Sequence, residues 1–377
     1  MHPQPPHPDL LHPVVRRAAA TVAVPKDTVE NSFTLHAPLE LLGRVGLLPL
    51  VAPQRHGDAI GMIEWLADTY EAAGDPVRPT VRPSTDEVSG LASGLTSAVA
   101  AGDLVGVDAH AVALLSRVSA AEAVGMLGDA VAPSLAAAGH APIGMYQLGR
   151  VRPGLSPLLL RGALRSIARR PEWRIDWHAS DEPPTTGDPS RLYDVLRELP
   201  VLGRPGSDFI FPLMSQVQGD ARVVASLRTL LADRFDTAAA ARTIARVAAW
   251  SMVHDDPEQA PYGWTHALTM PQAVMGLTGA GVQPRTALTV AATFAAGFRT
   301  AHGTVPLPER LVPADVPRTD ASWTDVATAA ALHEDAHLVK FTLAAHWAAA
   351  DDPAFAHLYL AAAAHLVEWW KADALVA

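Results

Sequence analysis

Apolar residues return at intervals of three and four along almost the whole chain, and this spacing limits the fold more than any other feature. It is the period of an α-helix that buries one face, and alanine, the best helix former, is abundant. Stretches in which apolar and polar residues alternate, the pattern of half-buried strands, are nearly absent. The sequence therefore predicts an all-α fold, a single large multi-helix bundle.

Clusters of proline and glycine separate the helical segments from one another. The periodicity predicts helices near 35–50, 57–73, 86–101, 107–117, 119–138, 142–150, 156–169, 189–199, 208–218, 220–234, 237–253, 264–279, 284–301, 322–350 and 353–372. The Pro-rich stretch 303–321 is a long connection without helical periodicity, so we expect it to be a lid over a site or a strap around the bundle.

Composition excludes several classes of protein. Hydrophobic residues make up 49% of the 377 residues and charged residues 18%, which indicates one folded domain over 31–377 with a large core. A net charge of -10 argues against binding to nucleic acid, which needs a basic surface. Cysteine is absent, so any metal must be bound by nitrogen and oxygen ligands.

The termini and the apolar runs predict where the protein resides. Residues 1–30 are rich in proline and histidine at their start and lack the basic and apolar regions of a signal peptide, so we expect a disordered arm and a cytoplasmic protein. The longest uncharged run, Gln259 to Pro284, is interrupted by Pro261 and Pro271, which argues against a membrane span. The sequence gives no prediction of the oligomeric state.

A faint internal repeat links two segments of the chain. "HAPLELLGRV" begins at His36 and "HAPIGMYQLGRV" begins at His140, and both open with His-Ala-Pro and close with Leu-Gly-Arg-Val. No regular period runs through the chain, so a solenoid is not expected. The repeat leaves two related helical halves as an alternative to a single undivided bundle.

Lysine is rare in this chain, and one lysine has an unusual setting. Lys26, Lys340 and Lys371 are the three lysines of the sequence, and Lys340 lies in the apolar segment "LHEDAHLVKFTLAAHW". A lysine there can snorkel to the surface or be buried, and a buried amine tends to lose its charge. On a continuous helix His333, His337 and Lys340 would share one face. A neutral amine can form a Schiff base with a carbonyl substrate, or take up carbon dioxide as a carbamate that binds a metal.

Three further histidines lie in apolar segments with few charges nearby: His36, His140 and His266. Any one of them alone is more often an ordinary buried histidine. Their position on three separate helices, together with His337 and Lys340, matches the way in which helical bundles build metal sites from facing side chains. The pattern therefore favours a shared metal centre.

The segments around these residues resemble the questin oxidase-like family over about residues 31–370. The resemblance lies in "HAPLELL", "GHAPIGM" and "THALTMPQAV", and above all in "DAHLVKFTLAA" followed by "YLAAAAHLV". It implies an oxidoreductase of natural-product biosynthesis, an oxygenase that acts on anthraquinone-type aromatic rings. It also implies a non-haem iron, Fe(II) acting with dioxygen, bound by four histidines and a lysine carboxylated by CO2; these would be His36, His140, His266, His337 and Lys340.

Several neighbouring residues receive roles under this interpretation. Asp335 either orients a ligand histidine or is an exposed helix residue, and His333 could replace a ligand. A flat polycyclic substrate, a quinone or a phenol, would suit a pocket of large apolar side chains, although such residues are more often plain core: Met145, Tyr146, Trp264 and Met270. The glycines of "GLTGAGVQ" lack the setting of a dinucleotide fingerprint, so an NADPH requirement has no motif to support it.

Three other functions remain open from the sequence. His254, Asp255 and Asp256 in "HDDP" resemble the histidine-aspartate pair of metal hydrolases. Lys340 could act as the Schiff-base lysine of an aldolase or decarboxylase. A noncatalytic helical binding protein with the same fold is the third alternative. Within the oxygenase hypothesis, ring cleavage, Baeyer-Villiger insertion and hydroxylation are all compatible with the residues, and so is the use of an external reductant.

Overall fold

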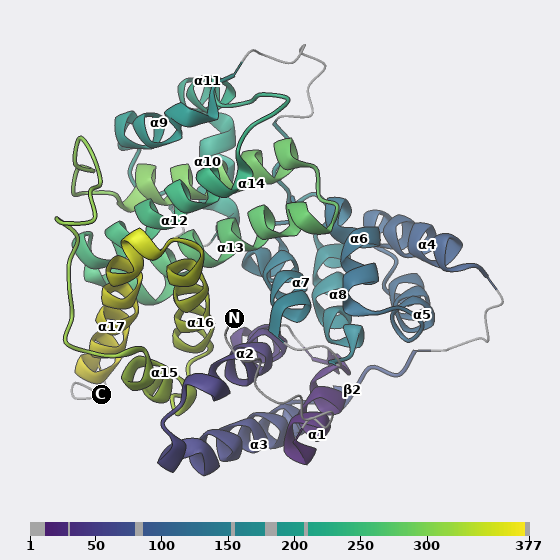
Figure 1. Cartoon of the computed structure of the whole chain (residues 1–377). Coiled ribbons are helices and arrows are strands. Elements are labelled where there is room, and N and C mark those ends of the chain that lie inside the picture. The colour runs from purple at the N-terminus through teal and green to yellow at the C-terminus, as the bar shows by residue number, and fades with distance from the viewer. Residues whose placement is uncertain are drawn as a thin grey trace, which may run out of the picture.

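The computed structural model describes residues 12–28, 31–79, 86–151, 155–177, 187–206 and 210–373. These residues form seventeen α-helices and one antiparallel pair of short strands, β1 (Lys26–Asp27) and β2 (Asp75–Pro76) (Figure 1). The predicted all-α class is confirmed. Within the described ranges, no helix combines the length and the apolar character needed to cross a lipid bilayer.

Polar residues such as Asn31, Ser119 and Asp236 cap the first turns of several helices. The first eight are α1 (Pro13–Val22), α2 (Ser32–Leu47), α3 (His56–Ala72), α4 (Val88–Ala101), α5 (Leu104–Leu115), α6 (Ala120–Val131), α7 (His140–Val151) and α8 (Arg161–Arg169). The others are α9 (Leu192–Glu198), α10 (Ile210–Gly219), α11 (Ala221–Arg228), α12 (Thr237–His254), α13 (Thr265–Gly276), α14 (Pro284–His302), α15 (Trp323–Ala331), α16 (Ala336–Asp351) and α17 (Ala356–Asp373).

A helix replaces part of the disordered arm predicted for 1–30. Residues 13–22 form α1, which begins with a proline in its first turn and buries Val15, Ala18 and Val22 against α3. The prediction is wrong here because the apolar residues after the Pro-rich start have helical spacing and find a partner helix. Residues 1–11, 29 and 30 lie outside the described residues.

The single helix predicted for 322–350 is also wrong, because the chain breaks between α15 and α16. Asp335 is the N-cap of α16, and its carboxylate accepts hydrogen bonds from the backbone N–H groups of His337 and Leu338. Arg44 of α2 donates to the carbonyl groups of Ala331 and His333, which lie at the break. His333 therefore precedes α16, and the predicted face shared by His333, His337 and Lys340 does not form.

Four helices form a closed ring in the middle of the molecule (Figure 1). In this ring α2 contacts α7 and α16, and α13 contacts the same two helices. The helices that connect successive ring members in the sequence pack around the outside. The two segments of the internal repeat lie in neighbouring members of the ring, α2 and α7.

Two glycines of α2 bring it unusually close to α16. A Cβ atom on Gly43 would lie 2.7 Å from Cγ1 of Val339 and 3.6 Å from Cα of Lys340. A Cβ atom on Gly46 would lie 2.6 Å from Cδ2 of Leu343. The close packing of α2 against α16 therefore depends on the absence of side chains at both positions.

Gly43→Ala is expected to destabilise the fold by about 1–3 kcal/mol, because Val339 is β-branched and has little freedom to move away from the added methyl group. Gly61→Ala is the matched control, since this glycine is in the middle of α3 and an added Cβ would contact nothing within 4 Å. The control should be stabilised by up to about 1 kcal/mol through helix propensity. Urea unfolding of both variants measures the difference, and equal stabilities would contradict the close packing of α2 and α16.

The Pro-rich connection 303–321 is tied to the bundle along its first half. The N–H of Val305 donates to Oδ1 of Asp255 at 2.8 Å, and the hydroxyl of Tyr193 donates to the carbonyl of Pro308 at 2.7 Å. Leu307 and Val316 are buried in the core. These anchors favour the strap over the lid.

Candidate metal centre

One histidine from each helix of the ring points into a common centre. His36 comes from α2, His140 from α7, His266 from α13 and His337 from α16. The centroid of the His36 ring lies 4.2 Å from that of His140 and 4.4 Å from that of His337. The His266 ring lies 5.3 Å from His337 and 5.9 Å from His140. The structure thus brings together the four histidines that the sequence singled out from distant segments.

Three of these histidines are close enough to bind one ion together. His36, His266 and His337 each offer a nitrogen, and these nitrogens lie within 4.8 Å of one another. All four rings are buried, with His36 the most exposed at 8%. Nitrogens that each lie about 2 Å from one ion are at most about 4 Å apart, so binding an ion would draw these rings closer together.

The centre lies where the N-terminal ends of the four helices meet. His140 is the first residue of α7, His337 is the second residue of α16, and His36 lies in the second turn of α2. His266 lies in the second turn of the helical stretch that begins with the π-helix Ala260–Trp264 and continues as α13. Each helix places a partial positive charge at its N-terminus. The centre is therefore an environment that favours an anion among the groups it holds.

The outward nitrogen of three histidines is fixed by a hydrogen bond. Nδ1 of His36 donates to the carbonyl of Ser32, and Nδ1 of His266 donates to the carbonyl of Tyr262, both at 2.7 Å. Nδ1 of His337 lies 3.2 Å from Oδ1 of Asp335. Because a carbonyl or carboxylate can only accept, Nδ1 carries the proton and Nε2 keeps the lone pair that can bind a metal.

Several nitrogens in the centre have no hydrogen-bond partner. Nε2 of His36 and both ring nitrogens of His140 are buried within the described structure without one. Buried polar atoms nearly always have a partner, and each one left without it costs about 1–3 kcal/mol. A metal ion bound by Nε2 of His36 and by one ring nitrogen of His140 would satisfy two of these three atoms, so the residues fit a metal centre.

Lys340 lies in the same centre and is fully buried, with 0% of its surface exposed. Its Nζ is 2.9 Å from Nε2 of His266. Burial lowers the pKa of this amine to about 7, while the charge of Asp335 opposes the shift. Lys340 is thus not a snorkelling surface lysine, and at neutral pH a large share of its amine is uncharged.

The histidines are neutral for the same physical reason. Burial lowers the pKa of His36, His140, His266 and His337 well below the ordinary value of 6.5. For His36, His266 and His337, the charge of Lys340 is the next largest cause, and for His140 it is the neighbouring His36. Neutral imidazole is the form that binds metals.

A cavity of about 370 Å³ leads to the histidines. It is lined by Asn31, Ser32, Leu35, His36, Ala137, Ala138, His140, Ile210, Tyr262, His266 and His337. Tyr262 is 54% exposed, and its ring stands perpendicular to that of His337 at 4.9 Å. Among these lining residues there is no Asp or Glu, no residue of the strap 303–321, and no Lys340.

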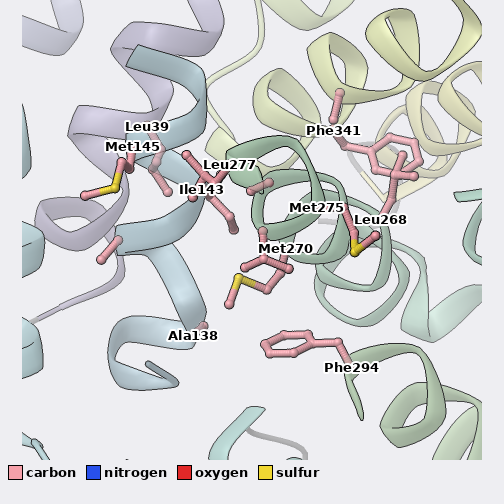
Figure 2. Packing of buried hydrophobic residues seen from close by; sticks show 14 of the residues in the cluster. Leu39, Ala138, Ile143, Met145, Leu268, Met270, Met275, Leu277, Phe294 and Phe341 are labelled. Carbon is pink, nitrogen blue, oxygen red and sulfur yellow. The ribbon is translucent and has the colours of Figure 1, made fainter. Parts of the chain in front are cut away.

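The four residues predicted for the substrate pocket do not line this cavity. Met145 and Met270 belong to the hydrophobic core (Figure 2), and Trp264 packs against Phe298. Tyr146 lies farther along α7, where its hydroxyl bonds to Arg150. Apolar side chains on helices more often fill a core than line a pocket, and Met145, Met270 and Trp264 are core residues here.

The sequence reasoning missed the residues that do form the cavity wall. Ser32 and Tyr262 each lie four positions before a histidine of the centre, so one helical turn separates them from His36 and His266. That spacing is a signal that could have identified them. Ile210, Ala137 and Ala138 come from other parts of the fold and carry no such signal.

A left-handed turn precedes His140. Ala137 and Ala138 have φ angles of 45° and 57°, and Gly139 follows with a φ of 78°. This conformation costs an alanine about 1–2 kcal/mol, and such strain is typical of functional sites. The turn positions His140 and forms part of the cavity wall.

Ala138→Gly is expected to stabilise the protein by about 1 kcal/mol, because glycine adopts the left-handed conformation without strain. Ala100→Gly is the control: this alanine is exposed in α4, and the change there should cost up to about 1 kcal/mol. Thermal or urea unfolding of the two variants measures whether each change raises or lowers the free energy of unfolding. A loss of stability in Ala138→Gly would show that the turn is not strained.

His333 and Asp335 have separate roles beside the centre. Nδ1 of His333 accepts a hydrogen bond from the N–H of Asp335, and its ring lies 5.1 Å from that of Trp370. His333 is not one of the histidines gathered at the centre. Asp335 both caps α16 and contacts His337, so it is the residue that orients that ring.

The residues of the "HDDP" segment make contacts that hold neighbouring segments of the fold together. Asp255 is buried and accepts hydrogen bonds from Arg299 at 2.6 Å and from Val305 at 2.8 Å. Nδ1 of His254 donates to the carbonyl of Trp250, and Asp256 pairs with Arg204. Both oxygens of Asp255 are used in these contacts, which leaves the segment no metal-binding geometry in the described structure.

Comparisons of the chain with protein-family models, with curated proteins and with solved structures found no match.

Proposed function

We propose that this protein is a metal-dependent oxygenase that binds non-haem iron and oxidises a polycyclic aromatic quinone or phenol. The observation that carries the proposal is the convergence of four neutral histidines, three of their nitrogens without partners, on one fully buried lysine. The resemblance to the questin oxidase-like family, noted from the sequence, supports the same ligands: His36, His140, His266, His337 and Lys340.

The charge balance of the centre supports a carbamate on Lys340. The histidines are neutral, the cavity lining has no carboxylate, and four helix N-termini add positive charge. A divalent metal ion would therefore lack a direct anionic ligand if Lys340 stayed an amine. A carbamate supplies that negative charge through an oxygen ligand, and iron accepts such mixed nitrogen and oxygen sets.

The neighbours of Lys340 are suited to carbamate formation. Neutral Nζ attacks the carbon of CO2, a nitrogen-carbon bond forms, and one proton leaves the nitrogen. Nε2 of His266 lies 2.9 Å away and already accepts a hydrogen bond from Nζ, so it can receive that proton and pass it to solvent. A pKa near 7 keeps the reactive amine available at neutral pH.

The position of Lys340 argues against a Schiff-base enzyme. A carbonyl substrate in the cavity would meet the histidine rings, because Lys340 is fully buried and absent from the lining. Carbon dioxide is small enough to pass between the rings during side-chain motion. Lys340 is therefore placed to bind the metal rather than the substrate.

The cavity offers what a flat aromatic substrate needs. Its volume of about 370 Å³ lies within the range of small-molecule sites, and the Tyr262 ring provides an aromatic wall. Asn31 and Ser32 can hydrogen-bond a phenol or quinone oxygen. Bound iron would supply the one-electron chemistry that lets dioxygen react with an organic molecule. The chain would position the substrate beside the buried histidines.

The test is the metal content and turnover of protein prepared without air and with bicarbonate. We expect close to one iron per chain, and oxygen-dependent consumption of an anthraquinone-type phenol, with the label of ¹⁸O2 found in the product. His337→Ala should lose the iron, whereas Asp256→Asn, a control at an exposed ion pair, should keep it. Iron-free wild-type protein, or turnover that continues without oxygen, would contradict the proposal.

A further inference from the structure

A second cavity, of about 530 Å³, lies apart from the histidines. It is lined by Tyr146, Arg150, Thr237, Ala238, Ala241, Arg242, Ala245, Gln272, Met275, Gly276, Thr278, Gly279, Ala348, Asp351 and Tyr359. It shares none of these residues with the cavity at the metal centre. The mechanism proposed above makes no use of it.

The two cavities lie at opposite ends of the same helices. On α7 the step from His140 to Arg150 is ten residues, and on α13 the step from His266 to Gly276 is also ten. On α16 the step from Lys340 to Asp351 is eleven residues. A helix rises 1.5 Å per residue, so about 15 Å separate the two sites. A ligand in the second cavity therefore does not reach the metal centre.

Most polar groups of this second cavity are paired within the protein. Arg150 binds Asp351 through two hydrogen bonds of 3.0 and 3.1 Å. The hydroxyl of Tyr359 donates to Asp352, and Gln272 donates to the carbonyl of Ala344. These contacts build a wall in which the charges of Arg150 and Asp351 cancel.

Arg242 is the charged group of the lining that lacks such a contact. It lies on α12, is partly buried, and has no hydrogen bond or ion pair with any described residue. A guanidinium carries five N–H donors and keeps its positive charge at all relevant pH values. The second cavity thus has one cationic group whose charge nothing in the described part of the chain balances.

We infer that the second cavity binds an organic monocarboxylate. The guanidinium of Arg242 matches a carboxylate with two parallel hydrogen bonds, and one unbalanced cation suits one negative charge. The methyl groups of Ala241 and Ala245 and the side chain of Met275 form an apolar wall for the body of the ligand. The volume accommodates a molecule of one or two rings.

The test uses 2-naphthoate as the probe and its neutral amide, 2-naphthamide, as the comparison, with binding followed by calorimetry. Wild-type protein should bind one naphthoate per chain. Arg242→Gln should weaken naphthoate binding at least tenfold and leave naphthamide binding unchanged, because only the charged hydrogen bonds are lost. Arg222→Gln is the control, since Arg222 is an exposed arginine of α11 outside the cavity, and it should change affinity less than twofold.

A second variant locates the site. Ala241→Trp fills the cavity and should abolish binding of both probes, with circular dichroism confirming that the helices remain. Both titrations are repeated on metal-free and on iron-loaded protein, and the affinity should be the same. The inference is overturned if Arg242→Gln binds naphthoate as tightly as wild type. It is also overturned if binding requires iron and survives Ala241→Trp, which would place the probe at the metal centre.

Discussion

Lys340→Met is expected to abolish iron binding and all turnover while leaving the fold at least as stable as the wild type. Lys340 is fully buried, and methionine has a similar volume without an amine to desolvate, which offsets the hydrogen bond lost to Nε2 of His266. Loss of an anionic ligand should lower iron affinity by at least about 100-fold. This is more than the loss expected when a residue that hydrogen-bonds to a ligand is replaced. Metal analysis and urea unfolding measure the two effects separately.

Lys371→Met is the matched control, because that lysine is exposed on α17 and pairs with Glu368 at the surface. It should keep the full iron content. Lys340→Ala adds a further test: it leaves a space that a short carboxylate such as propionate can enter, and added propionate should restore part of the iron binding. A Lys340→Met protein that still holds stoichiometric iron would exclude the carbamate.

Acid is expected to destabilise the metal-free protein steeply below pH 6.5. The four histidines have folded pKa values well below 6.5, so near pH 6 the unfolded chain binds protons that the folded protein does not. Stability is therefore lost as the pH falls. Each such histidine contributes about 1 kcal/mol between pH 6.5 and about pH 5.5, so four together cost about 4 kcal/mol. That is a large part of the stability of an ordinary domain.

Urea unfolding at a series of pH values checks this loss. His140→Gln should remove about one quarter of the dependence, because the other three buried histidines remain. His56→Gln, which changes an exposed histidine of α3, should leave it unchanged. Wild type and His140→Gln with parallel pH profiles would mean that His140 titrates alike in the folded and unfolded chain.

The helical fold and the identity of the gathered histidines were predictable because both depend on local patterns. Helix period and alanine content are properties of short windows, and the structure has helices over most of the predicted ranges. His36, His140 and His266 stood out because each is a polar residue in an apolar helix. A buried polar residue usually requires a partner, so several such histidines on separate helices suggest a shared site.

The break before α16 was not predictable from the same windows. It depends on Arg44, which lies almost three hundred residues earlier in the chain. The guanidinium of Arg44 donates hydrogen bonds to two carbonyl groups that a continuous helix would have satisfied within itself. The cavity wall depends on how distant helices meet, as Ile210 and Ala138 illustrate. The left-handed conformation of two alanines contradicts their local preference and is imposed by the surrounding structure.

The central claim is that one metal ion lies between the four histidines and Lys340. Diffraction from crystals of the iron-loaded protein, measured on either side of the iron absorption edge, tests it most directly. We predict a single anomalous peak about 2 Å from the ring nitrogens of His36, His140, His266 and His337, with planar density extending from Nζ of Lys340. The absence of a peak between these rings, or a peak at another place in the chain, would contradict the claim.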